Sequence, residues 1–134
     1  MTQFEQEQAA KKFVEFWKNK GDEKSDTQSF WISLLHDVFG VNDPTKFIEF
    51  EKRVKIENKS FIDGYIPSTK VLIEQKSISK DLSKHELQSD KTELTPYGQA
   101  KRYSDNLDYN ERARWIITCN FKEFQIYDMD KIHS

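Results

Sequence analysis

The first forty residues repeat their apolar side chains every three to four positions, which is the spacing of amphipathic helices. In the first predicted helix, residues 4–18, the apolar positions are Ala10, Phe13, Val14 and Trp17. A second helix is expected to begin at a cap formed by Ser25 or Asp26 and to stop at Gly40. Its broad, aromatic-rich apolar face is expected to pack in the core.

From residue 47 onward, short β-prone runs replace the helical spacing. Residues 47–57 predict a strand with a helical turn at its start. Residues 61–66 and 71–73 predict the two strands of a hairpin, because a turn signal stands between them at residues 67–70. The run 71–73 is apolar on both faces, as expected of a central strand that helices cover on both sides.

The last third of the chain begins with a polar stretch, residues 78–93, which is expected to be a mobile loop. Thr95 is a helix cap and Pro96 stands at the first helical position, so a helix is predicted to run on through Asn106. Two strands should follow, at 115–119 and 124–127. This order of elements predicts one α/β domain with a mixed central sheet flanked by helices, in which residues 1–43 are helical and residues 44–134 form the sheet core.

Composition limits the class of protein. A chain of 134 residues suits a single domain with one modest core. The single cysteine, Cys119, excludes an internal disulfide and a cysteine-based zinc site, and it is expected to be a small core residue. No apolar run of membrane-spanning length and no signal peptide is present, so no membrane partner is expected and the location should be cytoplasmic.

Two acidic residues and a lysine in the predicted hairpin are the candidate chemistry. If the turn centres near Ser68, Asp63 lies opposite Ile73 or Glu74. Glu74 and Lys76 share one face of their strand, because side chains alternate along it. Facing carboxylates repel each other, so the arrangement favours a divalent cation between them.

Magnesium suits such a site, since Mg²⁺ binds one or two carboxylates and keeps several waters. Asp63 and Glu74 would be its ligands, the backbone carbonyl of Gln75 would add a third oxygen, and Mn²⁺ is expected to substitute. Lys76 would orient the attacking water or stabilise charge on a phosphate in the transition state. The alternative is a solvated hairpin in which Glu74 and Lys76 are ordinary surface charges.

The predicted helix after residue 95 places Gln99 and Tyr103 four residues apart on one face. Together with Asp63 and the Glu74-x-Lys76 pattern, this pair resembles the PD-(D/E)xK nuclease superfamily, in particular its RecB-like branch. The resemblance implies that Gln99 and Tyr103 lie beside the active site and contact substrate or metal-bound water. Ile62 stands where the name of the superfamily has proline.

Longer segments, residues 49–54, 61–67, 72–77, 97–103 and 114–121, resemble the N-terminal nuclease domain of single-chain restriction–methyltransferase enzymes of the type IIL or IIG kind. The resemblance implies a methyltransferase and a target-recognition domain elsewhere in the full chain, so these residues are expected to be a fragment of a longer protein. It also implies a further metal contact from an acid before the first core strand. Glu51 fits that position, with its neighbour Glu49 or a plain surface role as alternatives.

The function predicted on these grounds is a metal-dependent endonuclease acting on double-stranded DNA. A RecB-like exonuclease or repair nuclease, and an inactive nuclease fold that serves as a docking module, are the alternatives. The formal net charge of −2 predicts weak DNA binding by this domain alone, because phosphate neutralisation drives such binding. Cutting both strands needs two active sites, so dimerisation on DNA is expected.

Overall fold

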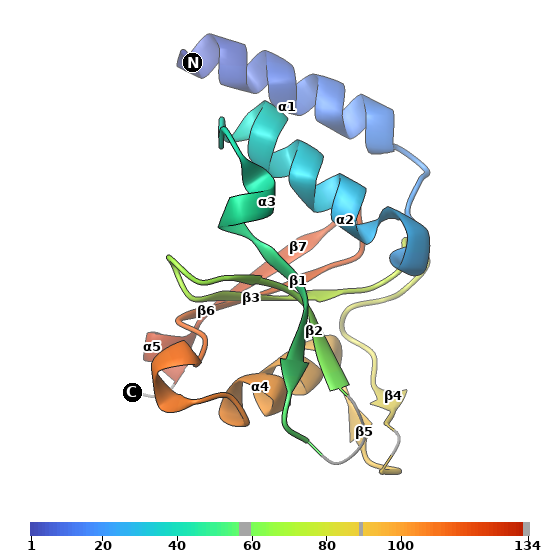
Figure 1. Ribbon diagram of the computed structural model, residues 1–134. Helices are drawn as coiled ribbons and strands as arrows, with labels where there is room; N and C mark the ends of the chain where they lie inside the picture. The colour runs from blue at the N-terminus through green and yellow to red at the C-terminus, as the bar shows by residue number, and fades with distance from the viewer. Residues whose placement is uncertain (57–59, 89, 133–134) are drawn as a thin grey trace.

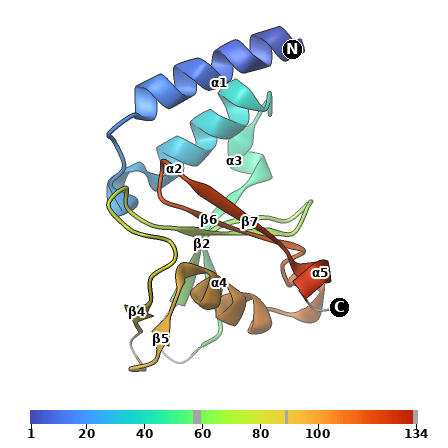
Figure 2. The same cartoon turned by 180° about the vertical axis from the view of Figure 1, so that it is seen from behind.

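A five-stranded sheet separates two layers of helices in the computed structural model, which describes residues 1–56, 60–88 and 90–132 (Figure 1). One layer holds α1 (Gln3–Trp17), α2 (Glu23–Ser33) and the π-helical turn η1 (Leu34–Val38). On the other face lies α4 (Pro96–Asp105), as the view from behind also shows (Figure 2). No helix in the described part of the chain is long and apolar enough to cross a lipid bilayer.

The sheet has the order β1-β2-β3-β6-β7. Its strands are β1 (Glu49–Val54), β2 (Ser60–Ile66), β3 (Val71–Gln75), β6 (Trp115–Cys119) and β7 (Phe124–Asp128). The pair β3–β6, which α4 connects, is parallel, and the other neighbours are antiparallel. The predicted α/β fold with a mixed sheet is therefore confirmed. The short elements α3 (Pro44–Phe47), η2 (Tyr109–Glu111) and α5 (Met129–Ile132) complete the chain.

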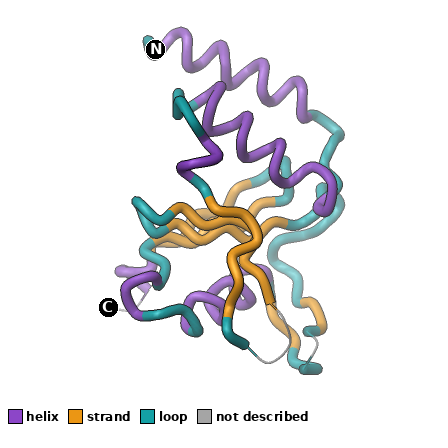
Figure 3. The backbone as a smooth tube through the Cα atoms, in the orientation of Figure 1, coloured by secondary structure: helices purple, strands orange, loops and turns teal. Residues whose placement is uncertain are grey.

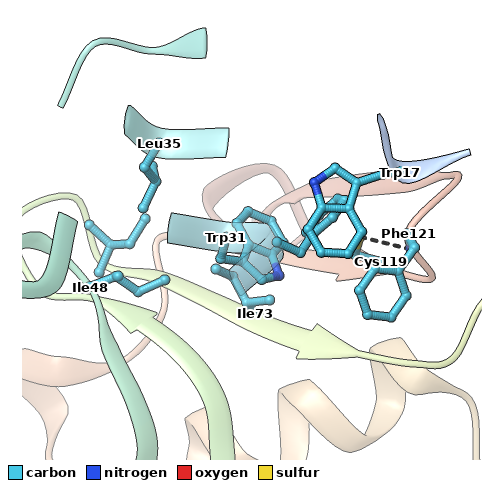
Figure 4. Packing of buried hydrophobic residues seen from close by; sticks show 9 residues of the cluster. Trp17, Trp31, Leu35, Ile48, Ile73, Cys119 and Phe121 are labelled. Carbon is cyan, nitrogen blue, oxygen red and sulfur yellow. Dashed lines mark hydrogen bonds between the residues drawn. The ribbon is translucent and has the colours of Figure 1, made fainter. Parts of the chain in front are cut away.

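Strand β3 contributes alternate side chains to two hydrophobic cores. Ile73 packs with Trp17, Phe30 and Trp31 on the α1–α2 side (Figure 4), whereas Leu72 packs with α4 residues on the opposite side. This placement confirms the prediction of a central strand covered on both faces. Cys119 lies fully buried in the first core, as predicted, and burial raises the pKa of its thiol to about 11.

Helix boundaries follow the predicted caps in one case and depart from them in the other. The Thr95 hydroxyl accepts a hydrogen bond from the backbone N–H of Gly98, and Pro96 opens α4, as predicted. The cap of α2 is Asp22, so the prediction of Ser25 or Asp26 was wrong. The carboxylate of Asp22 accepts a hydrogen bond from the backbone N–H of Ser25 at 2.8 Å, which starts the helix one turn earlier.

The first predicted strand is shorter than expected. Its initial helical turn is α3, which ends at Phe47, and β1 then runs to Val54. Residue 57, the predicted end of the strand, lies outside the described residues.

The polar segment 78–93, predicted to be a mobile loop, contains a two-stranded hairpin, β4 (Glu86–Leu87) with β5 (Glu93–Leu94). Figure 3 shows this hairpin on the α4 side of the sheet. Leu82 is buried, and the side-chain amide of Asn120 donates a hydrogen bond to the carbonyl of Lys80 at 2.8 Å. The prediction of a loop was wrong at residues 86–87 and 93, which form the hairpin. The other described residues of the segment belong to no helix or strand, and the mobility of the segment stays a prediction.

A buried hydrogen bond joins α2 to the end of β3. The indole N–H of Trp31 donates to the side-chain oxygen of Gln75 at 2.7 Å, and the Gln75 amide nitrogen donates to the carbonyl of Lys76 at 3.0 Å. Gln75 is fully buried. The orientation of the helical layer is therefore coupled to the strand that carries Glu74 and Lys76.

Trp31→Phe should lower the free energy of unfolding by about 1–3 kcal/mol beyond the loss of ring contacts, because it leaves a buried Gln75 oxygen without its donor. Urea unfolding measures this loss. Trp17→Phe is the matched control, since Trp17 lies in the same core and contacts other rings. Equal losses for the two variants would show that the hydrogen bond contributes nothing.

Candidate functional site

Strands β2 and β3 separate beyond the Gly64–Ile73 pair, and Asp63 lies at the point of separation. No Asp63–Glu74 backbone pair is formed, although the observed register would place them opposite each other. The carboxylate of Asp63 instead accepts a hydrogen bond from the backbone N–H of Gln75 at 2.7 Å. Strand β1 bends at the same level, where Glu51 has a φ of 55°. The carboxylate of Asp63 thus contacts the end of β3.

The carboxyl groups of Asp63 and Glu74 lie near each other, and each changes the pKa of the other. Glu74 is 3% exposed, and its Oε2 atom is buried without a hydrogen-bond partner among the described residues. Burial and the charge of Asp63 raise the pKa of Glu74 well above its ordinary value. Burial also raises the pKa of Asp63, although the bond from Gln75 opposes this change. Two buried carboxylates this close repel each other when both are ionised.

Lys76 lies beside this pair with its side chain 8% exposed. Its ammonium group donates hydrogen bonds to Gln99 Oε1 at 3.0 Å and to Glu86 Oε2 at 3.2 Å, and it lies 3.9 Å from Glu74 Oε1. Although burial would lower it, the pKa of Lys76 is raised because carboxylates surround the ammonium group. The lysine is therefore held as a cation.

Helix α4 supplies the predicted glutamine and tyrosine at this position. The Gln99 amide nitrogen donates a hydrogen bond to the Tyr103 hydroxyl at 2.9 Å, while its oxygen accepts from Lys76. The four-residue spacing on one helical face makes this contact possible. The structure thus brings together Asp63, Glu74, Lys76, Gln99 and Tyr103.

Two acidic residues near the site were missed by sequence reasoning. Glu86, in β4, bonds Lys76 from a segment that its composition marked as a loop. Glu23, at the start of α2, lines a pocket of about 230 Å³ together with Glu51 and Asp63. Partial burial and the charge of Asp63 raise the pKa of Glu23, against the effect of Lys76. Only the tertiary fold brings either residue here, and no local sequence signal marks them.

The carboxylates of the site meet the needs of some divalent cations and not of others. Across residues 1–56, 60–88 and 90–132, no group of three or more histidine, cysteine, aspartate or glutamate side chains is arranged to hold a metal ion. The Asp63–Glu74 pair nevertheless fits Mg²⁺, because that ion needs only one or two carboxylates beside its waters and because Glu74 presents a buried, unpartnered oxygen. The Gln75 side chain points toward Trp31, so only its backbone carbonyl is a candidate ligand. Glu51 is exposed beside Asp63, and its metal contact stays a prediction.

Comparison with known proteins identifies the family of the chain. The family model described as "MmeI, N-terminal domain" matches residues 8–134. No curated protein and no solved structure matches the chain. Because the match spans nearly the whole sequence, the chain belongs to the MmeI N-terminal domain family, a domain of restriction–modification enzymes.

Proposed function

We propose that this domain is a Mg²⁺-dependent endonuclease that hydrolyses phosphodiester bonds of double-stranded DNA. The observation that carries the proposal is the buried Asp63–Glu74 pair, with its unpartnered Glu74 oxygen, next to the cationic Lys76. Placing a carboxylate in such surroundings lowers stability unless a cation compensates it. Membership of a restriction–modification family supplies the context in which DNA is the substrate.

Asp63 and Glu74 would hold the ion, with the carbonyl of Gln75 and with Glu51 as further oxygen contacts and with Mn²⁺ able to substitute. Bound there, the ion supplies a water of lowered pKa and a Lewis acid for the phosphate. The PD-(D/E)xK resemblance supports these roles.

The residues of this chain supply the positioning and the positive charge. The ammonium group of Lys76 would stabilise negative charge that develops on the phosphate in the transition state. Gln99 accepts a hydrogen bond from Lys76 and donates one to Tyr103, so α4 fixes the direction of the ammonium group. Such preorganisation reduces the reorientation of the ammonium group that the reaction requires.

DNA recognition is proposed to reside in other domains of the full protein. The formal net charge of −2 gives this domain little attraction for phosphate. A methyltransferase domain and a target-recognition domain would hold the nuclease at its site and raise its effective concentration there. Dimerisation on DNA would supply the second active site for cutting both strands.

Calorimetric titration with MgCl₂ should show ion binding by the wild-type domain and none by Asp63→Ala. The reason is that Asp63 supplies one of only two proposed carboxylate ligands. Asp37→Ala, which removes an exposed carboxylate from η1, is the control and should bind as the wild type does. Equal binding by all three proteins would remove Asp63 from the site, and no binding by the wild type would favour the docking module.

Lys76→Ala should reduce nicking of supercoiled plasmid by about 10²–10³-fold while Mg²⁺ binding persists, because an ammonium group acts on the phosphate and not on the cation. High domain concentration compensates for weak DNA binding in this assay. Lys76→Met, which keeps the apolar stem of the side chain, should be equally inactive. A large fall in melting temperature for both variants would identify Lys76 as a structural partner of the carboxylates.

Glu74→Gln should raise the free energy of unfolding of the metal-free domain by about 1–3 kcal/mol at mildly alkaline pH. The folded-state pKa of Glu74 is raised, so its contribution to stability is present at low pH and is lost as the pH rises through that pKa. The gain on substitution should therefore be larger at pH above neutrality than in acid. Urea unfolding in EDTA measures it, and a gain that does not change with pH would contradict the assignment.

A further inference from the structure

Glu86 bridges two lysines at the edge of the site. Its Oε2 atom lies 3.2 Å from the ammonium nitrogen of Lys76, and its Oε1 atom lies 2.7 Å from that of Lys80. Although burial would raise it, the pKa of Glu86 is lowered because both lysines stabilise the carboxylate. One carboxylate thus forms ion pairs with two ammonium groups, one through each oxygen.

Separate parts of the fold place the three groups. Lys76 follows β3, and Gln99 of α4 orients it. Lys80 is fixed through its carbonyl, which accepts the bond from Asn120. Glu86 is set opposite Leu94 in the β4–β5 hairpin, directly before α4. The two-lysine arrangement is therefore built by the fold and does not depend on chance surface contacts.

Exposure increases outward from the buried lysine. The side chain of Lys76 is 8% exposed, that of Lys80 is 23% exposed and that of Glu86 is 33% exposed. Glu86 and Lys80 are therefore more accessible than Lys76 to a ligand that arrives from solvent.

Two ammonium groups placed to bind both oxygens of a carboxylate also suit the two non-bridging oxygens of a phosphodiester, because both ligands present paired anionic oxygens. Phosphate neutralisation by lysine and arginine drives protein binding to DNA. In the free protein the Glu86 carboxylate offsets one of these two positive charges and lies against both ammonium groups, so the pair adds less to DNA attraction until the carboxylate leaves.

We propose that Lys76 and Lys80 form a binding site for a backbone phosphate of DNA, and that the Glu86 carboxylate fills this site in the free protein. The choice of DNA as the ligand rests on the proposed nuclease function. Lys80 becomes a substrate-binding residue, and Glu86 becomes an internal competitor of the phosphate. No covalent bond is made or broken, because the exchange replaces one anion by another.

The test measures binding of a short, fluorescein-labelled DNA duplex by fluorescence anisotropy, at low ionic strength and in EDTA. Glu86→Gln should tighten binding by about fivefold, since DNA no longer has to displace the carboxylate. Lys80→Gln should weaken binding. In the double variant, the gain from Glu86→Gln should disappear, because two residues of one site are not additive.

Glu93→Gln is the matched control for charge alone, since Glu93 is an exposed carboxylate in the other strand of the same hairpin. The inference is overturned if Glu86→Gln and Glu93→Gln tighten binding equally, or if the gain persists without Lys80. Weaker binding by Glu86→Gln also overturns the inference, because Glu86 would then hold the two lysines in position for DNA and would not compete with it.

A second comparison keeps the test decisive if Glu86→Gln unfolds. Lys80→Gln must weaken binding more than substitution of exposed Lys84 by Gln, and equal effects overturn the inference. EDTA separates this question from the nuclease reaction. A domain that binds no Mg²⁺ can still show the Glu86 effect, and an active nuclease can lack it.

Discussion

The alternation of side chains along β3 determines both the packing of the domain and the position of its charged groups. Leu72, Glu74 and Lys76 face α4, whereas Ile73 and Gln75 face α1 and α2. The apolar members of each set fix the two helical layers. The polar side chains alternate in the same register as the apolar ones. A shift of β3 by one residue would therefore move both the core residues and the site residues to the opposite face of the sheet.

The charged groups of the candidate site lower the free energy of unfolding of the domain. A carboxylate with a buried, unpartnered oxygen has an unfavourable electrostatic environment, and only part of that cost is offset by Lys76. The surrounding structure compensates for this cost. Hydrophobic packing on both sides of β3 stabilises the fold and keeps the Glu74 side chain buried. This pattern is typical of sites whose geometry serves a ligand and not the fold.

Sequence reasoning succeeded where local chemistry decides structure. Thr95 and Pro96 are sufficient to mark the start of a helix. The apolar run of β3 has hydrophobic side chains on both faces, so both faces are expected to be covered. It failed where distant residues decide. The position of Glu86 depends on β5 and on Lys76, and the polar composition of its segment hides both. Asp63 reaches the predicted neighbourhood of Glu74 where the pairing of β2 and β3 ends, and no turn rule predicts this break in pairing.

The hydrogen bond between Trp31 and Gln75 also has an optical consequence. The indole ring is bonded to the residue that lies between Glu74 and Lys76, so its surroundings change with the charge and geometry at the end of β3. Indole emission depends on local polarity and on hydrogen bonding of the ring nitrogen. The domain therefore carries a fluorophore on α2 that is hydrogen-bonded to the strand that bears the site, and ligand entry there can be followed without any added label.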